Sequence, residues 1–200
     1  MNSKIILYAS FILVALVQLY VPAKMIWNKE NVIEKGAEYK FKAAPVDPSD
    51  PFRGKYISLN YDANTFEISN EQDWEGGEII YVTIITDEAG FAKVKSVSKE
   101  KPTENHYFIK AKVSYITGSS PGKLIIDYPF DRYYMEESKA YDAEQTYRQS
   151  QQDTNQVTYA LVSVKDGDVV LKDILIDGIS IREIVKKNQD RQARSGKPNM

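Results

Sequence analysis

The chain has 200 residues, with 26 lysine and arginine residues against 28 aspartate and glutamate residues, which gives a net charge of -2. This length suits one ordinary domain with an attached segment, and the balanced charge excludes a protein built to neutralise nucleic-acid phosphates. The chain contains no cysteine, so disulfides, thiolate zinc sites and cysteine nucleophiles are also excluded.

The first feature along the chain is an uncharged apolar run from Ile5 to Val21, in which only tyrosine, serine and glutamine are polar. A helix of about 17 residues nearly matches a hydrocarbon core of ~30 Å. Residues 1–23 are therefore predicted to form a retained transmembrane anchor, with the lipid bilayer as its partner.

Two other interpretations of this run stay open. A cleaved signal peptide would use Lys4 as its positive front and the residues around Pro22 as its cleavage site. A buried core helix would place the run inside the domain. The proline and the length of the run favour the anchor.

The orientation of the anchor follows from the charges at its two ends. Lys4 and the terminal amine favour an N-terminus inside the cell, although Lys24, Lys29 and Lys35 on the other side oppose this bias. We expect a single-pass protein of the cell membrane whose soluble domain lies outside the cytoplasm, in the periplasm if a second membrane is present.

Residues 24–36 are predicted to continue as a juxtamembrane stalk helix that ends at Gly36. The period-two alternation over 38–43 predicts a half-buried strand. The run from Glu78 to Thr86 is apolar on both faces and predicts a central strand that is covered on each side. The segment 107–116 predicts a strand that places on one side Tyr107, Ile109, Ala111, Val113 and Tyr115.

Turn signals separate further strands. Asp87 to Gly90 and the pair Asp166-Gly167 each lie between two apolar runs and predict hairpins, and Pro129 is predicted to end the strand that begins at Leu124. Strong helix formers predict a helix over 135–151. Residues 188–200 are polar and predict a disordered tail.

Together these elements predict an α+β fold that is mainly antiparallel β. A transmembrane helix precedes one β-rich domain over residues 37–187, which carries one or two short helices.

One segment, DPFRGKYISLNY, places a proline and a glycine before a strand. Gly54, Tyr56, Leu59 and Tyr61 fill the pattern Gly-x-Tyr-x-x-Leu-x-Tyr, and the segment resembles the signature of the GDYXXLXY family of membrane-anchored bacterial proteins. Lys55 stands where that family has aspartate. The segments YPFDRYYMEESKAYDAE and VSVKDGDVVLKDILIDG resemble the family's second aromatic segment and its closing hairpin.

The resemblance implies a protein without established activity that associates with multi-span membrane proteins. In the signature strand, Ile57, Leu59 and Tyr61 would share one side, opposite Tyr56 and Ser58. The candidate binding or signature residues are Arg53, Gly54, Tyr56, Leu59, Tyr61, Arg132, Tyr133, Tyr134 and Glu137. Two structural alternatives stay open: Arg53 forms an ordinary ion pair, and the tyrosines near Arg132 cap a small β core.

Candidate chemistry is sparse. His106 is the one histidine, which disfavours a catalytic metal site. The aspartates around the signature suit calcium, but turn chemistry explains them better; they are Asp47, Asp50 and Asp62. Four further carboxylates offer acid and base groups, without a spacing that places them in one pocket; they are Asp127, Asp131, Glu136 and Glu137.

The sequence therefore predicts a non-enzymatic, membrane-anchored domain that binds a membrane-protein partner or an envelope ligand. No catalytic, metal-binding or cofactor-binding residue is assigned, and no cofactor or nucleic-acid partner is expected. The alternative is an extracytoplasmic hydrolase that uses carboxylates or a serine and lysine pair, as signal peptidases do.

Overall fold

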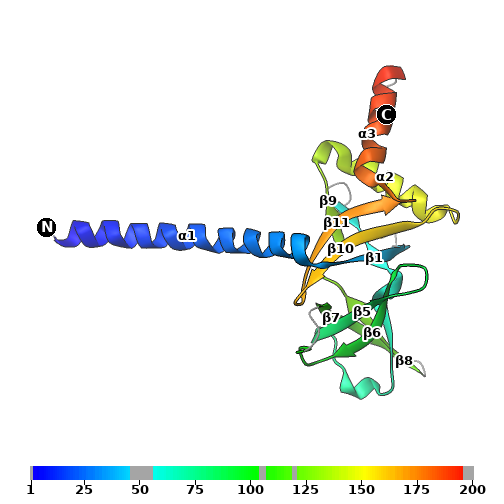
Figure 1. Cartoon of the computed structure of the whole chain (residues 1–200), viewed down its shortest axis with the longest axis horizontal. Helices are drawn as coiled ribbons and strands as arrows, with labels where there is room; N and C mark the ends of the chain where they lie inside the picture. The colour runs from blue at the N-terminus through cyan, green and yellow to red at the C-terminus, as the bar shows by residue number, and fades with distance from the viewer. Residues whose placement is uncertain (1, 46–55, 104–106, 119–120, 196–200) are drawn as a thin grey trace.

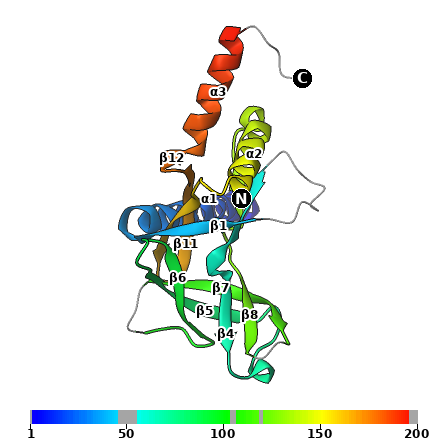
Figure 2. The ribbon, with the colours of Figure 1, turned by 90° about the vertical axis from the view of Figure 1, so that its right-hand side faces the viewer.

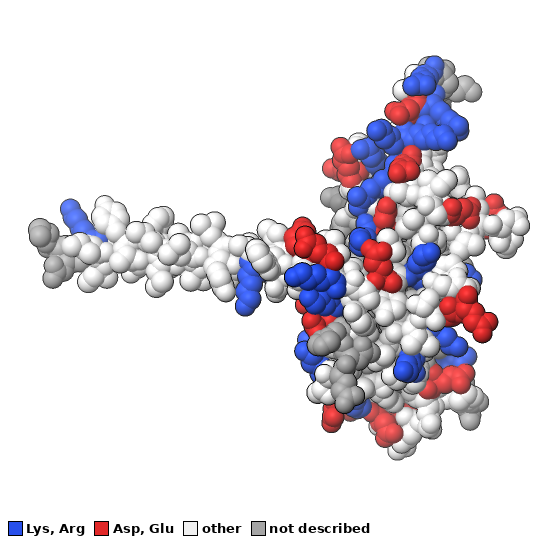
Figure 3. Space-filling model, in the orientation of Figure 1, with Lys and Arg blue, Asp and Glu red and all other residues white. Residues whose placement is uncertain are grey.

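The computed structural model describes residues 2–45, 56–103, 107–118 and 121–195. Its first element is α1 (Asn2–Lys35), one uninterrupted helix that projects from the side of the domain (Figure 1). The predicted anchor and stalk therefore form a single rod, which ends directly before Gly36. Figure 3 shows that the projecting part is almost free of charge, whereas both signs are mixed over the domain.

The rest of the chain builds the α+β, mainly antiparallel architecture that the sequence predicts. In chain order its elements are β1 (Ala37–Ala44), β2 (Tyr56–Ser58), β3 (Asn60–Tyr61), η1 (Asp62–Asn64), β4 (Thr65–Ile68), η2 (Glu71–Asp73), β5 (Ile79–Thr86), β6 (Ala92–Ser98), β7 (Phe108–Thr117), β8 (Gly122–Asp127), β9 (Arg132–Tyr134), α2 (Glu137–Gln152), β10 (Thr158–Lys165), β11 (Asp168–Ile176), β12 (Ile179–Ser180) and α3 (Ile181–Ser195).

These strands form two five-stranded sheets and one two-stranded ribbon. The first sheet has the order β12-β11-β10-β1-β3, the second has the order β4-β8-β7-β5-β6, and the ribbon joins β2 to β9. Helices α2 and α3 lie beside the first sheet, at the end of the molecule opposite the second sheet (Figure 2). The two sheets share one hydrophobic core.

Both predicted hairpins are confirmed. Asp166 and Gly167 have φ values of 54° and 93°, so they form the two-residue turn with positive φ at both positions that suits the twist of paired strands. Thr86 pairs with Ala92 across the other turn. The alternation in β1 is also confirmed, since Phe41 and Ala43 are buried while the lysines between them are exposed.

Two strand predictions need correction. In β5, Ile80, Val82 and Ile84 are buried, but Ile79 and Ile85 are 46% and 41% exposed, so only one face of this strand is fully covered. The sequence does not predict the exposed face of β5, because apolar residues also occur on solvent-exposed faces.

In β7, the predicted side is buried at Ile109, Ala111 and Val113, but Tyr115 is 57% exposed. The pairing of β7 with β8 shifts between Val113 and Tyr115. Such a bulge adds one unpaired residue, here Ser114, and turns the following side chain to the other face.

The C-terminus also differs from the prediction. Where the sequence predicts a polar tail from residue 188, α3 stays helical to Ser195. Ile181 and Val185 are buried, and Gln189 donates hydrogen bonds to Asp142 Oδ2 at 2.6 Å and to the Ser138 carbonyl at 3.2 Å on α2. The end of α3 has no apolar periodicity, and polar contacts with α2 stabilise it instead.

Candidate functional site

The two segments that carry the sequence resemblance meet in the β2–β9 ribbon. Tyr56 lies opposite Tyr134 and Ile57 lies opposite Tyr133. The ladder continues where the Leu59 amide donates to the Asp131 carbonyl at 2.7 Å. Segments about 75 residues apart in sequence therefore build one antiparallel unit.

The inner face of this unit is buried. Ile57, Leu59 and Tyr61 are 1%, 6% and 2% exposed, which confirms that they share one side. The Tyr61 hydroxyl donates to the Phe130 carbonyl at 2.7 Å, and the Tyr128 hydroxyl donates to the Ala63 carbonyl at 2.7 Å. Burial raises the pKa of both tyrosines above the ordinary value.

An aromatic cluster fills the space beneath the ribbon. The Phe41 ring from β1 lies 5.4, 5.5 and 5.1 Å from the rings of Tyr61, Tyr128 and Phe130, each in an edge-to-face arrangement. Such pairs contribute beyond their area of burial. Leu59, Tyr61 and Tyr133 therefore lie in the core of the structure, with exposed fractions of 6%, 2% and 3%.

Tyr133 has a second structural role. Its hydroxyl donates to Asp173 Oδ1 on β11 at 2.8 Å and accepts from Arg182 Nε on α3 at 2.5 Å. Burial, followed by the hydrogen bond to Asp173, raises the pKa of this tyrosine. Through these bonds Tyr133 links the ribbon to the first sheet and to the C-terminal helix.

The outer face of the ribbon is open. Tyr134 is 62% exposed, and its ring lies 5.6 Å from that of the half-buried Tyr56. The Arg132 guanidinium lies 5.0 Å from the centre of the Tyr56 ring. A hydrogen bond with Tyr134 and the nearby Tyr56 and Asp131 raise the pKa of Arg132, so it stays charged. We call Tyr56, Arg132 and Tyr134 the Tyr–Arg face.

The remaining candidates are dispersed or lie elsewhere. Glu137 begins α2 and is exposed, where a carboxylate suits the positive end of the helix dipole. Glu136 pairs with Lys139, while Asp131 lies 3.7 Å from Arg132. In the part of the chain that the structure describes, no three His, Cys, Asp or Glu residues are grouped so as to hold a metal ion. Several predicted residues lie outside the described ranges; they are Asp47, Asp50, Arg53, Gly54, Lys55 and His106.

Sequence reasoning missed Asp173 and Arg182. Asp173 interrupts the apolar run of β11, and a charged residue inside a buried strand is a sign that it has a partner. The partner itself was not predictable, because Tyr133 lies 40 residues away in the chain.

The described geometry defines a class of protein: a β-rich domain that two aromatic segments hold together, carried on a long apolar helix. One helix, over Lys4–Lys35, is long and apolar enough to cross a membrane. The family model named GDYXXLXY protein matches residues 18–174, and the chain belongs to this family. The match confirms the resemblance found in the sequence. No curated protein and no solved structure matched the chain.

Two buried tyrosines provide a matched test of the interpretation as core residues. Tyr61→Phe is expected to lower the free energy of unfolding by about 1–3 kcal/mol, because the buried Phe130 carbonyl loses its donor. Tyr147→Phe is the control: within the described residues the Tyr147 hydroxyl is buried without a hydrogen-bond partner, so its removal leaves no group unsatisfied and is expected to be neutral or stabilising. Urea unfolding followed by circular dichroism measures both. Equal losses for the two variants would contradict the assignment.

Proposed function

We propose that this protein is a non-enzymatic, membrane-anchored domain that binds a protein partner through the Tyr–Arg face. The α1 helix serves as the anchor, and the domain lies outside the cytoplasm. The length and apolar composition of α1 support the anchor. The location has its own test, since protease added to intact spheroplasts is expected to digest the domain, and full protection would place it in the cytoplasm.

The observation that carries the proposal is the contrast between the two faces of the ribbon. Tyr133 and its neighbours on the inner face are buried, whereas Tyr134 at the adjacent position is 62% exposed and is hydrogen-bonded to the charged Arg132. Tyrosine and arginine are enriched among the residues that dominate protein interfaces, because each offers a large contact area together with hydrogen-bonding groups. The buried network below also keeps this face in a fixed geometry.

The proposal is tested with a photo-crosslinking amino acid at position 134 in intact membranes of the native host. Position 115 supplies the matched control, because Tyr115 is similarly exposed, at 57%, but lies on the second sheet. We expect one defined protein to be crosslinked from position 134. The same protein should not be crosslinked from position 115. Mass spectrometry of the crosslinked product identifies the partner.

Variants at the Tyr–Arg face sharpen this test. Arg132→Ala combined with Tyr134→Ala is expected to weaken partner capture about thirtyfold or more, because the loss of an interface hot spot costs about 2 kcal/mol or more. Tyr115→Ala should leave capture unchanged. Circular dichroism of each variant shows whether the domain stays folded. Unchanged capture by a folded double variant would remove the Tyr–Arg face from the interaction.

A further inference from the structure

The domain is joined to α1 without a linker. The last turns of the helix lie against β10 and β11, where Val32 is 3% exposed. Ser163 Oγ donates to the Val32 carbonyl at 2.6 Å, and Lys165 Nζ donates to Asn31 Oδ1 at 3.2 Å. The position of the domain is therefore determined by the helix, because helix and sheet are bonded to each other at several points.

Apolar side chains on α1 continue beyond the predicted span. Met25, Ile26 and Trp27 are 64%, 64% and 77% exposed. Tryptophan with such exposure is unfavourable in water but common at the headgroup level of a bilayer, where its ring is apolar and its N–H finds a polar partner. The apolar pattern thus places the membrane interface close to Trp27.

The first contacts between α1 and the domain lie almost at the same height along the helix as Trp27. Lys29 Nζ donates to the Val169 carbonyl at 3.2 Å and lies 3.7 Å from Asp168 Oδ1. Trp27 and Lys29 differ by a rise of only about 3 Å along a helix. The tip of the β10–β11 hairpin therefore lies within about one helical turn of the interface.

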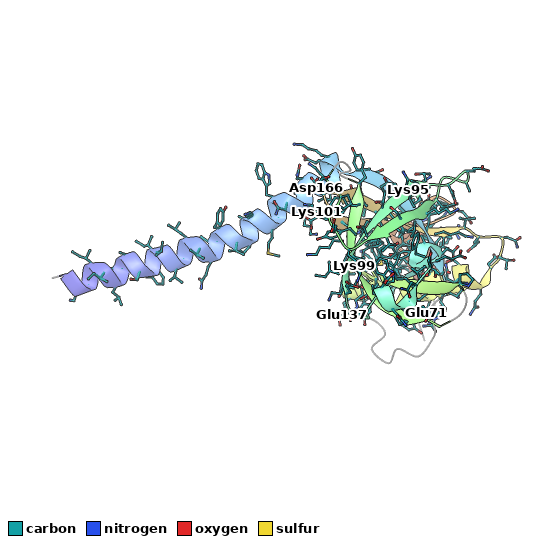
Figure 4. All side chains as sticks on the ribbon, turned by 90° about the horizontal axis from the view of Figure 1, so that it is seen from below. Glu71, Lys95, Lys99, Lys101, Glu137 and Asp166 are labelled. Atoms are coloured by element: carbon teal, nitrogen blue, oxygen red, sulfur yellow. The ribbon has the colours of Figure 1, made fainter. Side chains whose placement is uncertain are left out.

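A second segment lies beside this hairpin tip. The Lys110 amide donates to the Gly167 carbonyl at 3.1 Å, and a Cβ on Gly167 would lie 2.8 Å from the Phe108 ring. The Lys101 ammonium lies 5.8 Å from the centre of that same ring. Figure 4 shows Lys101 and Asp166 together at the side of the domain from which α1 leaves, and Glu71 on the side away from it.

We propose that this juxtamembrane surface, formed by Lys29, Lys101 and residues 166–168, lies directly against the phospholipid headgroups of the membrane that α1 spans. Its lysines suit lipid phosphates and its aspartates suit lipid amines, so the mixed charge matches zwitterionic headgroups. The inference rests on the membrane anchoring in the proposed function. It adds which side of the domain faces the bilayer, and that the domain does not stand away from it.

The absence of native cysteine makes a clean labelling experiment feasible. Lys101→Cys and Glu71→Cys, each in the full chain, are labelled with the same fluorophore and reconstituted into phosphatidylcholine vesicles that carry a quencher on a small fraction of headgroups. Both positions are exposed, so labelling leaves the core intact. We expect loss of most of the fluorescence at position 101 and little loss at position 71.

A lengthened stalk provides the control for distance. Seven helix-forming residues inserted after Trp27 raise the domain by about 10 Å and preserve its rotation to within about 20°. Quenching at position 101 should then fall toward that at position 71. Quenching that is equal at the two positions, or unaffected by the insertion, would overturn the inference.

Flotation of the same vesicles separates the two possible failures. A chain that floats with the vesicles but shows no difference in quenching is anchored without lying on the headgroups, and this overturns the inference alone. A chain that does not float overturns the anchoring and therefore the proposed function as well.

Discussion

Replacing Phe41 with alanine is expected to lower the free energy of unfolding by about 3–5 kcal/mol, the usual cost of emptying the site of a buried aromatic ring. The Phe41 side chain is 0% exposed and contacts three aromatic rings at centre-to-centre distances of 5.1 to 5.5 Å. Tyr61 comes from the first family segment, whereas Tyr128 and Phe130 come from the second. Each segment is held by its own strand pairing, so the three rings cannot all move inward to refill the cavity. Urea unfolding of the detergent-solubilised full chain measures the loss.

The control for this variant is Tyr115→Ala, which removes an exposed ring of similar size and is expected to change stability by less than about 0.5 kcal/mol. Because the ribbon lies over the cluster, Phe41→Ala should also weaken crosslinking from position 134. A loss below that of Tyr61→Phe would mean that the cluster does not hold the segments together.

Gly36→Ala is expected to cost about 2–3 kcal/mol through overpacking at the junction of α1 and the domain. An added Cβ would lie 2.4 Å from the Val32 carbonyl oxygen, 2.5 Å from Ser163 Oγ and 3.0 Å from the Val164 carbonyl oxygen. Two of these atoms belong to the backbone, and Ser163 Oγ is held by its own hydrogen bond to the Val32 carbonyl. The Val32 carbonyl and Ser163 Oγ cannot move aside without breaking the hydrogen bond that joins the helix to β10.

The thermal midpoint of the full chain and hydrogen exchange at the Val32 and Gly36 amides measure this effect. The matched control is Gly76→Ala, where the nearest atom to an added Cβ is the Ser114 carbonyl oxygen at an ordinary 3.6 Å. We expect faster exchange and a lower midpoint for Gly36→Ala only. If both variants behave alike, the rigid junction between α1 and the domain is not present in solution.

The candidate site was predictable only in part. The family resemblance marked two aromatic segments in the sequence, but it did not predict that they pair as β2 and β9 and so bring Tyr56 beside Arg132 and Tyr134. Which tyrosine is exposed and which is buried did not follow from the residue type. Tyr133 and Tyr134 are neighbours in β9, yet one is 3% and the other 62% exposed. Alternation separates them, but only packing against the rest of the chain decides which side is the core.

Local pattern was sufficient wherever the deciding interactions are close in sequence. The apolar run of α1, the alternation around Phe41 and the Asp166-Gly167 turn each express the preferences of a few adjacent residues, and the structure agrees with all three. Tertiary structure alone decided the bulge at Ser114, the extension of α3 to Ser195 and the bond between Tyr133 and Asp173. Each of these depends on a contact with residues distant in the chain. Such a contact produces no periodic pattern of residues in the sequence, so local pattern does not predict it.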